Sequence, residues 1–248
     1  MSKHFELMQK IEEDRQPKVH AAPELAGRNS RAKNSSVPPR WASDETLRLV
    51  HQIFLSQTEG APRLVVFAGI DPGNGCSEIC ASVAESLAKG TRGRVCLVEA
   101  NFHSPTLPHL FQTTNFDGLT EALDQRDQPM ASYAKPTMQE NLWLLSSGRI
   151  TAYSSQLLHS DDLRERLLEL RESFDYVVID APPLTRYSEG IAIGQAVDGL
   201  VLILEAEATH REAASAVAAN LRAANIPILA AVLNKRNFPI PEKIYRHL

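Results

Sequence analysis

The fold is decided by the stretch RLVVFAGIDPGNGCSEICASVAESLAK, residues 63–89. Residues 63–69 form a continuous apolar run of the kind found in strands that are covered on both faces of a sheet. A glycine-rich turn follows, and residues 77–89 have the apolar periodicity of a helix. A strand that leads through such a turn into a helix is typical of α/β proteins with a parallel sheet.

The remainder of the chain repeats this alternation of strands and helices. Further strands are predicted at 94–100, 141–148, 175–183, 199–206 and 227–234. Helices are predicted at 44–54 with Ser43 as N-cap, at 118–125, at 154–174, before Ala196 and at 209–225. This order predicts a single α/β domain with a mostly parallel sheet and helices on both faces. Ligands of such sheets bind beyond the carboxyl ends of the strands, so the candidate site is sought there.

Residues 1–40 differ in composition from residues 41–248, which we expect to form the α/β domain. The first 40 residues hold eight lysines and arginines against five acids. Phe5, Met8 and Ile11 recur at helical spacing and predict one short helix over residues 4–14. The Pro- and Ser-rich stretch after it, residues 17–40, predicts a flexible linker.

Composition excludes some classes of protein. A net charge of −4 over 248 residues does not suit a cationic nucleic-acid binder. The three cysteines are odd in number and clustered, which argues against a disulfide framework and for a reducing cytoplasm. No apolar run reaches the ~18 residues of a membrane span, and the N-terminus is too charged for a signal peptide.

The turn after the first strand has the glycines of a phosphate-binding loop. Gly73 and Gly75 let backbone N–H groups converge on an anion at the helix N-terminus. In the standard pattern G-x-x-x-x-G-K-S/T, lysine reaches the phosphates and the hydroxyl binds magnesium. Here Cys76 takes the lysine position, Ser77 keeps the hydroxyl, and Ile70 replaces the first glycine. An ordinary strand-to-helix turn explains this loop equally well. The predicted nucleotide-binding residues are Gly73, Asn74, Gly75, Cys76, Ser77 and Glu78.

An acidic residue lies near the carboxyl end of each of two other predicted strands. FDYVVIDAPP (174–183) carries Asp180, which could hold magnesium together with Ser77 or cap a helix. VCLVEANFHSPTLPHLF (95–111) ends its strand in Glu99 and Asn101, beside the same crevice. Asp180 and Glu99 are therefore the candidate catalytic residues.

These three motifs, in this order, resemble those of the bacterial tyrosine kinases of capsule and exopolysaccharide synthesis, a P-loop family related to Min and Par proteins. DGLVLILEAEAT and PILAAVLNKR are similar to the family's closing strands, and the similarity runs from about residue 44 to 235. The resemblance implies ATP or ADP with magnesium as ligands, and it implies that Asn234 faces the base.

The residues that depart from the family pattern are those expected to bind phosphate or to take part in catalysis. Cys76 replaces the lysine, Glu78 a hydroxyl, and Asn101 the second acid of the second motif, while His103 or Ser104 stands at an arginine. Loss of one group that stabilises transition-state charge typically costs on the order of 10²–10³ in rate. We therefore predict a degenerate member that binds nucleotide weakly and does not catalyse. Two interpretations of Cys76 stand beside each other. It is a small residue that is tolerated where the lysine was lost, or it is a reactive thiol at the helix N-terminus that acts as a redox switch.

The termini and the first helix bear on partners. The family usually ends in a tyrosine cluster, whereas this sequence has only Tyr245. The family's assembly pattern is Glu-x-x-Arg-x-x-Arg, and this sequence differs from it by one residue, with Glu45, Arg48 and His51 at that spacing. The alternative is that these residues form a solvated helix face. The leading hypothesis is a regulatory or scaffold partner of a membrane-embedded polysaccharide copolymerase or kinase-adaptor protein. It would act as a homo- or hetero-oligomer at the inner face of the membrane, without nucleic acid. The alternatives are an active ATP-dependent tyrosine autokinase and a Min/Par-like positioning ATPase.

Overall fold

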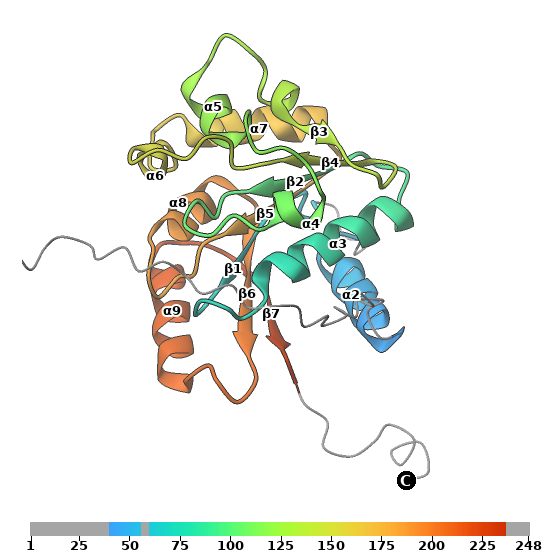
Figure 1. The fold of residues 1–248 in the computed structure, drawn as a ribbon. Helices are drawn as coiled ribbons and strands as arrows, with labels where there is room; N and C mark the ends of the chain where they lie inside the picture. The colour runs from blue at the N-terminus through green and yellow to red at the C-terminus, as the bar shows by residue number, and fades with distance from the viewer. Residues whose placement is uncertain (1–39, 56–59, 237–248) are drawn as a thin grey trace, which may run out of the picture. The chain divides into compact units, whose positions relative to one another are not determined.

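A seven-stranded sheet forms the centre of the structure, a computed structural model that describes residues 40–55 and 60–236 (Figure 1). The strand order is β3-β4-β2-β5-β1-β6-β7. The strands are β1 Leu64–Gly69, β2 Val95–Glu99, β3 Lys135–Pro136, β4 Leu142–Leu145, β5 Tyr176–Ala181, β6 Gly199–Glu205 and β7 Ile228–Asn234. Only the edge pair β3–β4 is antiparallel among these strands. The predicted α/β class with a mostly parallel sheet is confirmed.

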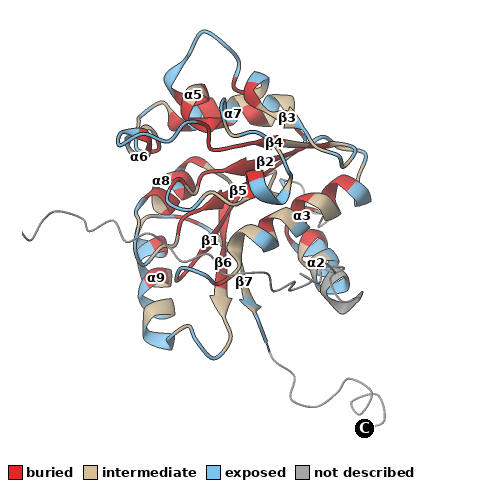
Figure 2. Cartoon of the chain, in the orientation of Figure 1, coloured by how far each residue is buried: buried red, intermediate tan, exposed pale blue. Residues whose placement is uncertain are grey.

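Helices cover both faces of this sheet, and each face buries its own apolar cluster (Figures 1 and 2). On one face lie α2 Arg40–Ile53, α3 Cys76–Gly90 and α4 Leu107–Leu110. On the other lie α5 Leu119–Asp124, the 3-10 helix η1 Met130–Tyr133, α6 Ser154–Leu157, α7 Leu163–Ser173, α8 Glu189–Ala196 and α9 Arg211–Ala223. All six residues of β1 are buried, as its continuous apolar run predicts. No helix within the described residues is long and apolar enough to cross a membrane.

Two predictions about helices were wrong. The expected helix 154–174 is divided into α6 and α7. At the break, the Ser160 hydroxyl donates to the Leu157 carbonyl at 2.8 Å, and Leu163 N donates to the Ser160 carbonyl at 3.1 Å. Such local side-chain bonds compete with helical ones. Ser43 does not cap the first helix, because α2 already begins at Arg40. The predicted helix 4–14, nearly all of the predicted linker and Tyr245 lie outside the described residues.

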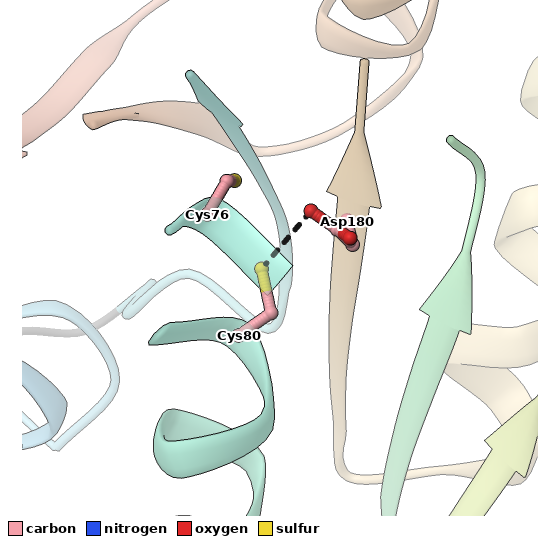
Figure 3. Close-up of side chains that lie close together, drawn as sticks. All are labelled: Cys76, Cys80 and Asp180. Carbon is pink, nitrogen blue, oxygen red and sulfur yellow. Dashed lines mark hydrogen bonds between the residues drawn. The ribbon is translucent and has the colours of Figure 1, made fainter. Parts of the chain in front are cut away.

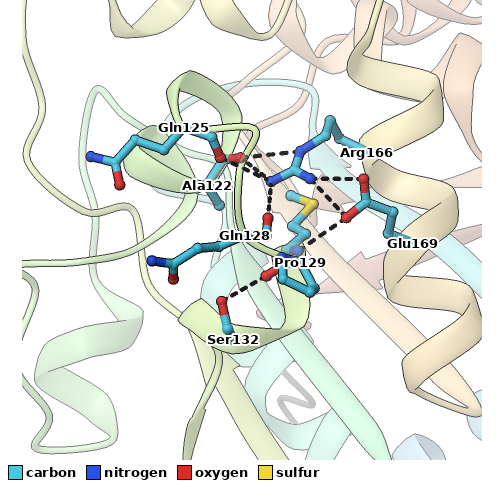
Figure 4. Close-up of polar contacts among 8 residues, drawn as sticks. Ala122, Gln125, Gln128, Pro129, Ser132, Arg166 and Glu169 are labelled. Carbon is cyan, nitrogen blue, oxygen red and sulfur yellow. Dashed lines mark hydrogen bonds and ion pairs between the residues drawn. The ribbon is translucent and has the colours of Figure 1, made fainter.

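The buried Arg166 of α7 ties the segment between α5 and η1 to the helix layer (Figure 4). Its Nε donates to the Ala122 carbonyl at 3.1 Å, and its Nη2 donates to the carbonyls of Ala122, Gln125 and Gln128. Its Nη1 binds both carboxylate oxygens of Glu169, at 2.7 and 2.8 Å. One guanidinium therefore satisfies a carbonyl near the end of α5, that of Ala122, and two carbonyls of the segment that follows, those of Gln125 and Gln128.

Replacing Arg166 by methionine should lower the free energy of unfolding by about 3 kcal/mol, because it leaves these carbonyls and Glu169 without their partner. Urea unfolding followed by circular dichroism measures the change. Arg164 is the matched control, since it lies on the same helix but is exposed, with one 3.4 Å contact to the Gln195 carbonyl. Arg164→Met should cost under about 0.5 kcal/mol. Equal losses in the two variants would contradict this role of Arg166.

Candidate functional site

The turn between β1 and α3 has the backbone shape that a phosphate loop requires. Gly73 and Gly75 have φ angles of 81° and 82°, in the left-handed region that favours glycine. Gly75 is the N-cap of α3, and the first helical bond runs from Ile79 N to the Gly75 carbonyl at 3.2 Å. The N–H groups of the first turn therefore have no acceptor within the helix, which is the arrangement that binds anions.

Hydrogen bonds from three side chains hold this loop in place. Asn74 is 3% exposed, and its Nδ2 donates to the Ile203 carbonyl of β6 at 2.9 Å. Asn234, at the end of β7, donates from Nδ2 to the Asn74 carbonyl at 2.8 Å. The adjacent Lys235 donates to the Gly73 carbonyl at 2.5 Å. Asn234 thus supports the loop, and its predicted contact with a base stays a prediction.

A cavity of about 300 Å³ lies over the loop, at the carboxyl ends of the strands. Its lining includes six residues predicted from the sequence, Gly73, Asn74, Gly75, Cys76, Ser77 and Glu78, together with Asn101. Arg186, Tyr187 and His103 also line it. Neither Arg186 nor Tyr187 belongs to a motif from which the site was predicted.

Asp180 is fully buried beside the start of α3. Its Oδ2 accepts a hydrogen bond from the Ser77 hydroxyl at 2.5 Å, and the Cys80 thiol lies 3.6 Å from its Oδ1. Its carboxylate therefore contacts side chains of the first turns of α3, and neither of these contacts is with a backbone N–H group at a helix N-terminus. Cys80 was missed as a site residue, although its spacing of four from Cys76 places both on one face of a helix.

Glu99 is the register partner of Asp180 across β2 and β5, and its carboxyl is buried. Its Oε2 accepts hydrogen bonds from Thr106 N and Leu107 N, both at 2.8 Å, at the start of α4. Its Oε1 is buried without a hydrogen-bond partner among the described residues. One oxygen of the carboxyl thus holds the start of α4, and a protonated Glu99 can hydrogen-bond to Asp180 through the other.

Burial raises the pKa values of the ionisable groups gathered at this site. It raises the pKa of Glu99 to about 8, helped by the negative charge of Asp180. Burial also raises the pKa of Asp180, against the hydrogen bond from Ser77. The hydrogen bond with Cys80 acts to lower the pKa of Cys76, but burial and the Asp180 charge outweigh it and raise the pKa to about 12. This favours the interpretation of Cys76 as a tolerated small residue over that of a reactive, low-pKa thiol, because burial near carboxylates opposes formation of the thiolate.

A second polar group forms the wall of the cavity. His103 Nε2 lies 2.8 Å from Oε1 of the buried Glu189, and its ring stacks on Tyr187 with ring centroids 3.6 Å apart. Burial alone would raise the pKa of Glu189, but the hydrogen bond with His103 and the other bonds outweigh it and lower the pKa. Sequence reasoning marked His103 only as a residue at an arginine position, since its partners lie more than 80 residues away.

The chain is similar to known proteins in its sequence and in its fold. No family model matches the chain. The chain is 26% identical over 197 residues to the tyrosine-protein kinase YwqD of Bacillus subtilis, covering 79% of this chain and 82% of YwqD. It is 24% identical over 211 residues to the putative tyrosine-protein kinase CapB of Staphylococcus aureus, covering 82% and 92% of the two chains.

Solved structures agree on the fold. The kinase domain of the Escherichia coli tyrosine kinase ETK matches with a TM-score of 0.75 at 19% identity, over 93% of this chain and 89% of that one. MinD from Pyrococcus horikoshii, complexed with Mg-ADP, matches with a TM-score of 0.58 at 18% identity, over 75% and 76%. The fold is thus that of P-loop kinase domains and MinD-like proteins. The resemblance seen in the sequence is confirmed, since the relatives that match the chain are bacterial proteins named as tyrosine-protein kinases.

The residues present fit the magnesium nucleotide of such folds only in part. Ser77 and Asp180 supply the hydroxyl and carboxylate oxygens that would hold magnesium. The Cys76 and Cys80 thiols, however, gather at the same carboxylate, and Mg²⁺ binds oxygen in preference to sulfur. The loop also offers a thiol where phosphate needs a cation. The donor set therefore does not match a magnesium nucleotide.

Replacing Glu99 by glutamine should stabilise the protein at pH 8 by on the order of 1 to 3 kcal/mol in metal-free buffer. The amide oxygen can keep the bonds to Thr106 N and Leu107 N, while the amide nitrogen can donate to Asp180. Folding raises the pKa of Glu99 from 4.5 to about 8. The contribution of this carboxyl to the stability of the native protein is therefore fully present below about pH 4.5 and is lost as the pH rises toward 8.

The variant's advantage should therefore shrink at pH 5, where Glu99 stays protonated in the native state. Thermal unfolding at the two pH values measures both differences. Glu99→Leu is the control, because it removes the charge but leaves the two N–H groups unpaired, so it should destabilise. A glutamine variant that is no more stable than the native chain at pH 8 would contradict this account.

Proposed function

We propose that the chain is a capsule or exopolysaccharide biosynthesis protein with a degenerate phosphate loop. It would work in the cytoplasm as a regulatory or scaffold partner of a membrane-embedded polysaccharide-assembly protein, not as a kinase. The observation that carries the proposal is Cys76, which lies at the first position of α3 and lines the cavity where the family pattern requires a lysine.

The charges around the cavity support weak nucleotide binding. Asp71 and Glu78 line it, and the carboxyls of Asp180 and Glu99 lie buried at the adjoining strand ends. Phosphate would meet these acids without the loop lysine that normally offsets its charge. Phosphoryl transfer depends on positioning and on electrostatic stabilisation, so both ground-state binding and turnover should suffer.

One observation favours the active autokinase as a second candidate. Arg186 is the one lysine or arginine among the described residues that line the cavity. An arginine can bind phosphate oxygens from outside the loop, as arginines do in other phosphoryl-transfer enzymes. Arg186 is exposed in the segment after β5, whose Thr185 is hydrogen-bonded to Ile70 and Asp71. It could therefore reach a nucleotide in the cavity from beside the loop.

The surface of α2 supports the partner part of the proposal. Glu45 and Arg48 are exposed, with the 43%-exposed Leu47 beside them. An apolar side chain among charges of both signs suits a protein contact better than a purely solvated face does. The alternative of a Min/Par-like positioning ATPase rests on the fold shared with MinD. Its membrane-binding segment would fall at residues 237–248, outside the described residues.

Isothermal calorimetry of the purified chain should show no sub-micromolar binding of MgATP, and ADP should bind at least as well because it lacks the most repelled phosphate. No tyrosine phosphorylation should appear after incubation with MgATP. Cys76→Lys should restore binding more than turnover, because Glu99 and Asn101 remain changed from the family pattern. Mass spectrometry that finds phosphotyrosine, with its loss in Arg186→Ala, would establish the autokinase instead.

Charge reversal in Arg48→Glu should weaken association with the polysaccharide-assembly protein without unfolding the domain, since an exposed charge is usually worth under about 1 kcal/mol. A pull-down from the native host, probed for that protein, measures association, and a melting curve checks the fold. Arg164→Glu, on the other face of the sheet, is the matched control. If Arg48→Glu keeps the partner while Ser77→Ala abolishes polysaccharide output, the scaffold proposal is wrong.

A further inference from the structure

Two thiols and a carboxylate converge beneath the phosphate loop (Figure 3). Cys76 and Cys80 lie one turn apart on α3, and Asp180 faces them from β5. One ligand atom from each residue lies within 4.8 Å of the other two, and Cys80 Sγ lies 3.6 Å from Asp180 Oδ1. A tetrahedral zinc ion holds its sulfur and oxygen ligands about 3.5 to 3.8 Å apart, given bond lengths of about 2.0 to 2.3 Å. Small side-chain rotations would therefore suffice to form such a site.

Asp180 is the charged group of this cluster. It is fully buried, accepts a hydrogen bond from Ser77 and has no ion pair among the described residues. The buried carboxyl of Glu99 is its register neighbour across β2 and β5 and supplies no positive charge. Buried charges in proteins are paired or coordinate a metal, so a divalent ion held by the two thiols would compensate the Asp180 carboxylate.

We propose that Cys76, Cys80 and Asp180 bind a zinc ion where relatives of this fold would hold a magnesium nucleotide. Thiolate ligands select Zn²⁺ over Mg²⁺, and the charge of the bound ion stabilises the two thiolates. On binding, both thiols release their protons to solvent and form Zn–S bonds, and Asp180 supplies one oxygen. Cys76 lines the cavity, so the fourth position faces the cavity and is open to water or a polar ligand.

This inference goes beyond the proposed scaffold role, which needs no metal. A zinc ion on Asp180 would occupy the carboxylate that magnesium requires. The substitution of lysine by Cys76 then changes the ligand class of the site from phosphate to a thiophilic cation.

Cobalt(II) binding to the full-length chain tests the site, because Co²⁺ replaces Zn²⁺ and reports its ligands in the absorption spectrum. The chain is kept reduced and stripped with a chelator before titration. One equivalent should produce a thiolate-to-cobalt charge-transfer band and the intense visible bands of tetrahedral Co²⁺, and Zn²⁺ should abolish both. Zn²⁺ should also raise the melting temperature of the native chain.

Cys76→Ser and Cys80→Ser should each lose the charge-transfer intensity and bind Zn²⁺ at least about 10-fold more weakly. Cys76 is partly exposed, so its variant is the one expected to fold normally if Cys80→Ser does not. Cys96→Ala is the matched control, since Cys96 is buried in the apolar cluster on the opposite face of the sheet. A native chain without the charge-transfer band would overturn the proposal. So would a band that Cys76→Ser retains, or one that Cys96→Ala loses equally.

Discussion

The burial of β1 between β5 and β6 is the constraint on which the rest of the structure depends. All six of its residues are buried, and it pairs with a parallel strand on each side. Polar side chains within such a strand would lose their water without gaining partners. Polar chemistry is therefore confined to the carboxyl edge of the sheet, where Ser77, Glu99 and Asp180 come together.

At that edge the balance of charge decides what the protein can hold. A phosphate loop with its lysine sets one cation between an anionic ligand and the acids of the strand ends. In this protein the acids and the loop backbone remain, but a thiol stands in the place of the cation. The same substitution would disfavour phosphate and brings soft donor atoms together. The proposed weak nucleotide affinity and the proposed affinity for a thiophilic metal would thus share one structural cause.

The sequence predicted the features that depend on local pattern. The central strands were found because their apolar runs are fully buried, and the loop because Gly73 and Gly75 need left-handed φ angles. The break in the helix at Ser160 was missed, because the leucines on either side keep a helical spacing while a side-chain bond ends the helix. The bracing of the loop was missed for another reason. Lys235 and Gly73 are 162 residues apart, and no local pattern reports such a contact.

That bracing has a consequence for how the protein can signal. Asn74 fastens the loop to β6, while Asn234 and Lys235 fasten it to the end of β7. Nucleotide switches work because a segment is ordered by one ligand and released with another. Here three side chains of the chain itself hold the loop without any ligand, so a ligand that rearranged the loop would have to break these bonds. If the proposed partner docks on this domain, it would meet the same loop shape whether or not a ligand is bound.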